Sequence, residues 1–213
     1  KEIKAQDLAI EALNGCLNIA ERTGDIFLEA RSRNMLGMVL GDVGRFDEAD
    51  AELEQSRACL AKMNDTSHLP KVVANLAGIL KQRADAAISS GARETGAVLL
   101  GKAIEVLAEG VDIAKADDNG YEFADKMSLL AEYHHLAGDQ QAAATLVRQA
   151  LASAHELNHP QIIVETHLGL GRILLAQNNL ADAETELKRA LELAREAEIH
   201  ELQMQIHRSL AEC

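Results

Sequence analysis

The sequence is poor in aromatic residues, with 3 Phe, 2 Tyr and no Trp among its 213 residues. β-Sandwiches and β-barrels fill their cores with aromatic and β-branched side chains, so this scarcity argues against both folds. Only 2 Pro interrupt the chain, while Ala, Leu, Glu and Gln, which favour helices, are abundant. The composition therefore predicts an all-α protein.

Several functional classes are disfavoured by other features that the sequence lacks. It contains no apolar run near the ~20 residues of a membrane-spanning helix, and no signal-peptide pattern. Its formal net charge of −13 opposes binding to nucleic-acid phosphates or to an anionic membrane. The widely spaced Cys16, Cys59 and Cys213 form no CxxC pair, which predicts reduced thiols in a cytoplasmic protein. We therefore expect no nucleic-acid, membrane, metal or cofactor binding.

The chain repeats itself with a period of 40 residues. A small residue followed four positions later by an aliphatic one marks each period, at Ala9, Ala49, Ala103, Ala143 and Ala183. A Leu followed by a small residue gives a second marker, at Leu36, Leu76, Leu130, Leu170 and Leu210. Both markers advance in steps of 40, 54, 40 and 40, so they agree on the period and on one insertion of 14 residues.

Within each period, apolar residues recur at the i, i+3, i+4, i+7 spacing of a helix. Gly44, Gly138 and Asn178 fall where a first helix should end in a left-handed residue, and Pro70 and Pro160 fall where such a helix should begin. Each unit is therefore expected to contain a helix A, a short turn, a helix B and a short loop. We predict one domain with a half repeat at 1–23, repeats at about 24–64, 65–118, 119–158 and 159–198, and a half repeat at 199–213.

The marker residues resemble the tetratricopeptide repeat. Helix A of that family carries Leu-Gly and a large residue three positions on, as in Leu36-Gly37 with Leu40, and helix B carries Ala and a large residue, as in Ala49 with Leu53. Aliphatic or polar residues replace the family's aromatic ones, and the period is 40 rather than 34. The longer period is similar to that of repeats in bacterial regulatory and signalling proteins. The resemblance implies a right-handed superhelical solenoid of antiparallel helix–turn–helix repeats with a concave groove.

The resemblance also implies that helix A lines the groove, at fixed offsets from the Leu-small marker. These offsets give Arg31, Asn34, Met38 and Asp42 in the first complete unit, and Lys71, Asn75, Gly78 and Lys81 in the second. The third unit gives Asp125, Ser128, Glu132 and His135, and the fourth gives Glu165, Leu168 and Arg172. The predicted groove is thus basic in its N-terminal half and acidic in its C-terminal half. Groove amides such as Asn34 and Asn75 are candidates to bond an extended peptide.

No residue pattern indicates catalysis. The chain has no zinc-binding HExxH, no phosphate-binding glycine loop and no nucleophile motif. Its eight His include His155, His159 and His167, which we place in a loop region and interpret as surface and packing residues. The predicted function is therefore a protein- or peptide-binding module that acts as a scaffold or sensor, and not an enzyme.

Two alternatives stay open at this stage. Neither end of the array shows a polar capping helix, so we interpret the sequence as a fragment of a longer protein. It would then be the N-terminal regulatory segment of a bacterial signalling enzyme, such as a diguanylate cyclase, or of a transcription regulator. The other alternative is self-association, as a homodimer formed through the open ends or through the insertion.

The insertion occupies about 84–97, around the turn of the second unit. Divided evenly, its 14 residues lengthen each helix by seven, or about two turns and ~10 Å. The turn is expected at Ser89, Ser90 and Gly91. We expect Ala84, Ala87 and Ile88 to pack on Val98 and Leu99. Exposed apolar residues at the tip would favour a docking or dimer surface over a self-packed extension.

Overall fold

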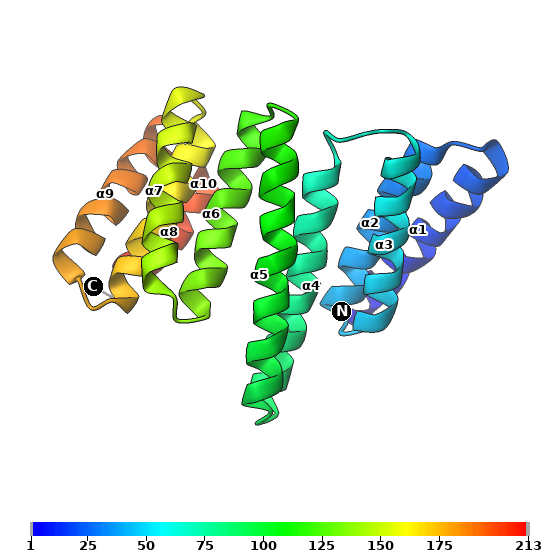
Figure 1. The fold of residues 1–213 in the computed structure, drawn as a ribbon, viewed down its shortest axis with the longest axis horizontal. Helices are drawn as coiled ribbons and strands as arrows, with labels where there is room; N and C mark the ends of the chain where they lie inside the picture. Colours follow the sequence, from blue (N-terminus) through cyan, green and yellow to red (C-terminus); the bar gives the residue numbers. More distant parts are fainter. Residues whose placement is uncertain (1, 212–213) are drawn as a thin grey trace. The chain divides into compact units, whose positions relative to one another are not determined.

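Helices are the only regular secondary structure over residues 2–211, which a computed structural model describes, with side chains from residue 5 onward. The predicted thiol of Cys213 lies outside the described residues. The ten helices of this range are α1 Glu2–Thr23, α2 Ile26–Asp42, α3 Phe46–Lys62, α4 Leu69–Ser89, α5 Arg93–Ala116, α6 Gly120–Leu136, α7 Gln140–Glu156, α8 Pro160–Ala176, α9 Leu180–Glu196 and α10 His200–Leu210 (Figure 1). No helix between residues 2 and 211 has the length and apolar character needed to cross a membrane.

The helices form two compact units, which divide within α5 between Ile113 and Ala114. In the first unit α2 packs on α1 and α3, and α4 contacts both α2 and α3. In the second unit α7 packs between α6 and α8, α9 packs on α8, and α10 contacts both α8 and α9. Consecutive helices in each unit run antiparallel (Figure 1), and the all-α prediction is confirmed.

The turns between helices use left-handed residues, as the sequence predicted. Gly44, Gly138 and Asn178 have φ values of 79°, 86° and 58°. A left-handed residue just after a helix lets the next backbone N–H groups bond the last carbonyl groups of that helix. Gly44 N, for instance, donates to Gly41 O over 2.9 Å. Helices α2, α6 and α8 each end after 17 residues, or about five turns, and the chain then reverses within three residues.

The two sequence markers meet in the core of the α2–α3 and α8–α9 hairpins. A Cβ atom added at Gly37 would lie 2.6 Å from Leu53 Cγ, and one added at Gly171 would lie 2.6 Å from Leu187 Cγ. Leu53 and Leu187 are both fully buried. The small residue of one marker thus makes room for the aliphatic residue of the other, which explains why both markers share one period.

The insertion lengthens the hairpin of α4 and α5 at its tip. The end of α4 and the start of α5 each lie 47 residues after their counterparts in the α2–α3 hairpin, seven more than the period. The turn contains Ser90 and Gly91, as predicted. The expected packing on Val98 is wrong, because that side chain is 56% exposed. Gly96 lies against α4 instead: a Cβ atom there would be 2.5 Å from Ile88 Cγ1.

The expected loop position of three histidines is also wrong for two of them. His155 lies in the last turn of α7, and His167 lies within α8, where it is buried and bonds Glu186 Oε2 through Nδ1 over 2.7 Å. Only His159 precedes a helix. Helix α8 begins at Pro160, immediately after His159, so the loop is shorter than its polar sequence suggested.

Candidate functional site

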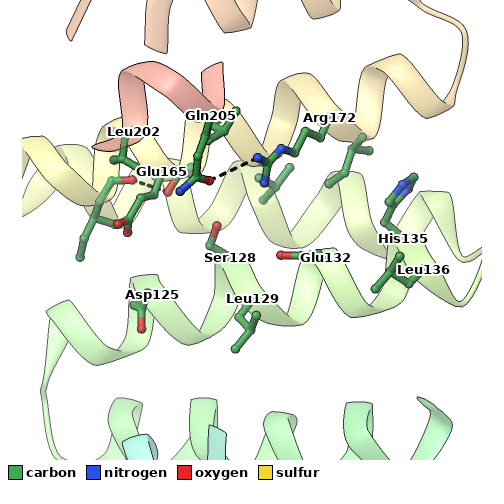
Figure 2. Close-up of a pocket in the computed structure, with 16 residues that line it drawn as sticks. Asp125, Ser128, Leu129, Glu132, His135, Leu136, Glu165, Arg172, Leu202 and Gln205 are labelled. Atoms are coloured by element: carbon green, nitrogen blue, oxygen red, sulfur yellow. Dashed lines mark hydrogen bonds between the residues drawn. The ribbon is translucent and has the colours of Figure 1, made fainter. Parts of the chain in front are cut away.

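A groove opens in the second unit, where α6, α8 and α10 lie next to one another (Figure 2). Its volume is about 470 Å³. All three are the first helices of their hairpins by sequence position, and α8 contacts both of the others. Side chains from three successive repeats therefore face one cavity.

The floor of the groove is apolar and buried. Ile162, Leu168, Ile173 and Leu202 line it, and each is less than 9% exposed. Gly169 adds no side chain, and a Cβ atom there would meet only Ser128 Oγ, at 3.7 Å. The floor therefore offers a ligand apolar side-chain contacts. At Gly169 no side chain covers the backbone of α8.

Two carboxyl groups, those of Asp125 and Glu165, stand at one end of the groove (Figure 2). Burial, followed by the nearby charge of Asp125, raises the pKa of Glu165, although Gln161 Nε2 donates to its Oε1 over 2.9 Å. Asp125 is bonded by Lys126, whose Nζ also lies 3.0 Å from Glu122 Oε2. Burial opposes the charge of Lys126, but these two carboxylates raise its pKa. The positive charge of Lys126 is thus balanced by Asp125 and Glu122, which lie on the same helix, α6.

Glu132 and Arg172 face the middle of the groove from opposite walls, α6 and α8 (Figure 2). Arg172 is held by α10, since its Nη2 donates to Gln205 Oε1 and its Nε donates to Ser209 Oγ, both over 3.3 Å. Glu132 is exposed and has no hydrogen bond or ion pair with any residue between 5 and 211. The two walls therefore present an acceptor and a donor that do not neutralise each other.

A second, smaller pocket of about 140 Å³ lies in the first unit. Arg31, Asn34 and Lys71 line it, and the guanidinium of Arg31 sits 5.8 Å from the centre of the Phe27 ring. Asn75 Nδ2 donates to Asn34 Oδ1 over 2.8 Å, so these amides bond each other. No acidic side chain lines this pocket.

The remaining residues expected from the first two repeats lie elsewhere. Met38, Gly78 and Lys81 line neither pocket, and Lys81 Nζ is paired with Asp85 Oδ2 at 2.8 Å. Asp42 is exposed at the end of α2. The offsets therefore place only part of the N-terminal set together.

The C-terminal set is brought together completely. The groove is lined by Asp125, Ser128, Glu132, His135, Glu165, Leu168 and Arg172, all of which the offsets had given. Sequence reasoning missed Gln205, although the same offset of five residues before Leu210 leads to it. Three carboxylates and the guanidinium of Arg172, all of them in the predicted set, give this lining an excess of negative charge.

The two cysteines within the described residues differ in their surroundings. Cys59 is buried, and this burial raises the pKa of its thiol, which disfavours the nucleophilic thiolate. Cys16 is exposed on α1. Across the described residues, no three His, Cys, Asp or Glu side chains are grouped closely enough to hold a metal ion.

Comparison with known proteins gives the family. The tetratricopeptide repeat family matches residues 30–69, and a second model of the same family matches residues 127–149 and 164–189. The chain contains tetratricopeptide repeats. Repeats of this family mediate contacts between proteins through the concave surfaces they form. No curated protein matches the chain.

Solved structures share the fold of this tetratricopeptide-repeat chain. BtubC (BKLC) from P. vanneervenii has 14% identity and a TM-score of 0.66, over 98% of this chain and 85% of that one. A kinesin-light-chain-like protein from Podosopora anserina with nearly identical TPR-like repeats has 20% identity and a TM-score of 0.59, over 92% of this chain and 90% of that one. At these identities, the likeness concerns the fold alone.

Proposed function

We propose that this chain binds an extended peptide segment of a partner protein in the groove of α6, α8 and α10, and that its role is binding rather than catalysis. The observation that carries the proposal is the pairing of a buried apolar floor with Glu132 and Arg172 on opposite walls. An extended peptide presents N–H and C=O groups to both sides. A carboxylate on one wall and a guanidinium on the other match these two groups.

The groove also suits a peptide because two of the polar side chains that line it are already held in place. Two hydrogen bonds to α10 hold Arg172, and His135 Nδ1 lies 2.8 Å from Gln140 Oε1. Side chains fixed before binding lose less conformational entropy when the ligand arrives. Helix packing positions the floor residues in the same way, so little reorganisation opposes binding.

A random 12-residue peptide library displayed on phage and selected on the intact chain tests this proposal. Peptides that survive selection are synthesised, and their affinities are measured by calorimetry against the native chain, Glu132→Trp and Glu156→Trp. Glu132→Trp places a bulky ring in the groove, whereas Glu156 is exposed at the end of α7, outside it. We expect at least a tenfold loss for Glu132→Trp and no change for Glu156→Trp. Equal affinities for all three proteins would refute the groove as the binding surface.

The tip of the α4–α5 hairpin is a second candidate contact surface, favoured by its exposed apolar side chains. Ile88 is 45% exposed and Val98 is 56% exposed. Exposed apolar groups that lie close together often mark a protein contact. If the tip joins two copies of the chain, light scattering should give twice the 23.0 kDa chain mass, and Ile88→Lys with Val98→Lys should return it to one chain. A single-chain mass for the native protein would exclude this role.

A further inference from the structure

We infer that the peptide bound in this groove is basic, with a Lys or Arg side chain seated against Asp125 and Glu165. The inference rests on the proposed peptide-binding function and adds the chemistry of the partner. It starts from the charged groups that line the groove. Three are carboxylates, on Asp125, Glu132 and Glu165, and one is the guanidinium of Arg172. The empty groove therefore has an excess of negative charge, and a cationic segment complements it.

The burial of Glu165 identifies the end at which the cation lies. Removing a carboxylate from water is costly unless a positive group replaces the lost solvation. Within the described part of the chain, Glu165 has an amide donor from Gln161 but no ion pair. Lys126 and His159 lower the pKa of Glu165 through their charge, but neither forms an ion pair with it, and Lys126 Nζ is bonded to Asp125 and Glu122 instead. An incoming ammonium or guanidinium group would supply that ion pair.

The floor next to Glu165 favours a long basic side chain over a small free cation. Ile162 and Leu202 line this part of the groove and are buried, and Leu202 lies beside Glu165 in Figure 2. Lys and Arg pack their methylene stems along apolar surface while the charged group remains with polar partners. A peptide side chain thus contacts both the floor and the carboxylates.

Arg172 sets where along the peptide the basic residue stands. It faces the middle of the groove opposite Glu132, and a second cation there would be repelled. Asp125 and Glu132 are seven residues apart on α6, which corresponds to about 10 Å along the helix axis. An extended peptide covers about 10 Å in three residues. The residue near Glu132 and Arg172 should therefore lie about three positions from the Lys or Arg.

The net charge of the chain supports the same partner. A formal charge of −13 attracts basic segments at long range and repels acidic ones. Long-range attraction accelerates encounter, while the groove selects the position of the basic residue. Both effects favour a basic peptide and disfavour an acidic one.

The test uses the peptides selected from the random phage library on the intact chain. Among the peptides that bind the native chain but bind Glu132→Trp at least tenfold more weakly, Lys or Arg should be enriched at one position. The tightest peptide is then made with this residue replaced by Met, and both peptides are titrated into the native chain, Glu165→Gln and the charge-matched Glu156→Gln. On the native chain and on Glu156→Gln, the Met peptide should bind at least tenfold more weakly. On Glu165→Gln, the difference should fall below threefold.

A second variant combines Glu132→Gln with Glu165→Gln and leaves the Asp125–Lys126 contact intact. It should bind the tightest selected peptide, with its basic residue in place, at least tenfold more weakly than the native chain does. Circular dichroism must show native helix content for each variant. Selected peptides that need the groove but carry no basic residue would overturn the inference and leave the proposed function standing. An equal effect of the Met replacement on all three proteins would overturn it as well. If no selected peptide binds Glu132→Trp more weakly than the native chain, both the inference and the proposed function would be overturned.

Discussion

At Gly171, the backbone of α8 lies against the side chain of Leu187 in α9. An added Cβ atom would lie 2.6 Å from Leu187 Cγ and 2.7 Å from its Cδ2. Leu187 is fully buried among Val164, Leu168, Ala190 and Leu191, so it has no space into which to retreat. The position therefore requires glycine for its lack of a side chain rather than for its backbone freedom.

Gly171→Ala should lower the free energy of unfolding by about 1–3 kcal/mol, because the extra methyl group overpacks the core. Gly101, within α5, is the matched control, since an added Cβ atom would have no neighbour within 4 Å. Gly101→Ala should raise stability by up to about 1 kcal/mol through helix propensity. Urea unfolding followed by circular dichroism measures both changes. A Gly171→Ala protein as stable as the Gly101→Ala protein would contradict this packing.

Glu165 should make stability depend on pH. Burial raises its folded pKa above the ordinary value of 4.5, so the folded state holds this proton more tightly than the unfolded state does. The ionised group is therefore a cost that develops as pH rises from 4.5 through the folded pKa, and it is fully present above that pKa.

Glu165→Gln should accordingly stabilise the chain at pH 7, by less than about 1 kcal/mol because water still screens the half-buried group. The gain should vanish when unfolding is measured at pH 4. Glu156→Gln, at an exposed position, should alter stability by less than about 0.5 kcal/mol at both pH values. A native chain more stable at pH 7 than Glu165→Gln would show that the carboxylate is stabilised in the fold.

At the scale of elements, the α4–α5 hairpin shows what sequence reasoning reached and what it missed. The shift in the repeat markers located the insertion, and the Ser-Ser-Gly stretch located its turn. The faces of the two added helical segments were not predictable in this way, because Val98 is apolar yet 56% exposed, and Ile88 is 45% exposed although it packs against α5. Gly96 carries no hydrophobic signal, yet it is the α5 residue that Ile88 contacts.

Gly96→Ala should therefore destabilise the hairpin by about 1–3 kcal/mol, because its methyl group would lie 2.5 Å from Ile88 Cγ1 and 3.0 Å from Ala84 O. Truncating the partly exposed Ile88 to Ala should restore much of this loss. Hydrogen exchange of the amides in 84–97 gives the local stability. Equal loss in Gly96→Ala and in the Ile88→Ala, Gly96→Ala double variant would place the cause in the backbone rather than in this contact.

At the scale of the whole molecule, the period of 40 residues was sufficient to predict the order and class of the helices, since the same two sequence markers recur in each repeat. The groove of the second unit followed from the same period, because equal offsets on α6 and α8 place side chains on one surface. The polar contacts inside it did not follow. That Arg172 is held by Gln205 and Ser209, while Glu132 is not paired within residues 5–211, depends on side-chain geometry that a repeat pattern does not encode.

Charge also acts at this scale. Because the net charge is −13 and three carboxylates line the groove, binding of a basic peptide should weaken as salt is added. We expect the dissociation constant to rise several-fold between 50 and 500 mM sodium chloride, with most of the change in the association rate. Stopped-flow anisotropy measures this rate, and a salt-independent association would argue against electrostatic attraction by the chain.

The most direct measurement of the central claim is a nuclear magnetic resonance titration of the isotope-labelled chain with the tightest selected peptide. If the groove binds the peptide, saturable shifts should concentrate on α6, α8 and α10, with the largest at Ser128, Glu132, Gly169 and the Nε–H of Arg172. Glu132→Trp should abolish them at the same peptide concentration. Shifts that instead gather at Ile88 and Val98 on the hairpin tip, or around Arg31 and Lys71 in the first unit, would contradict the claim.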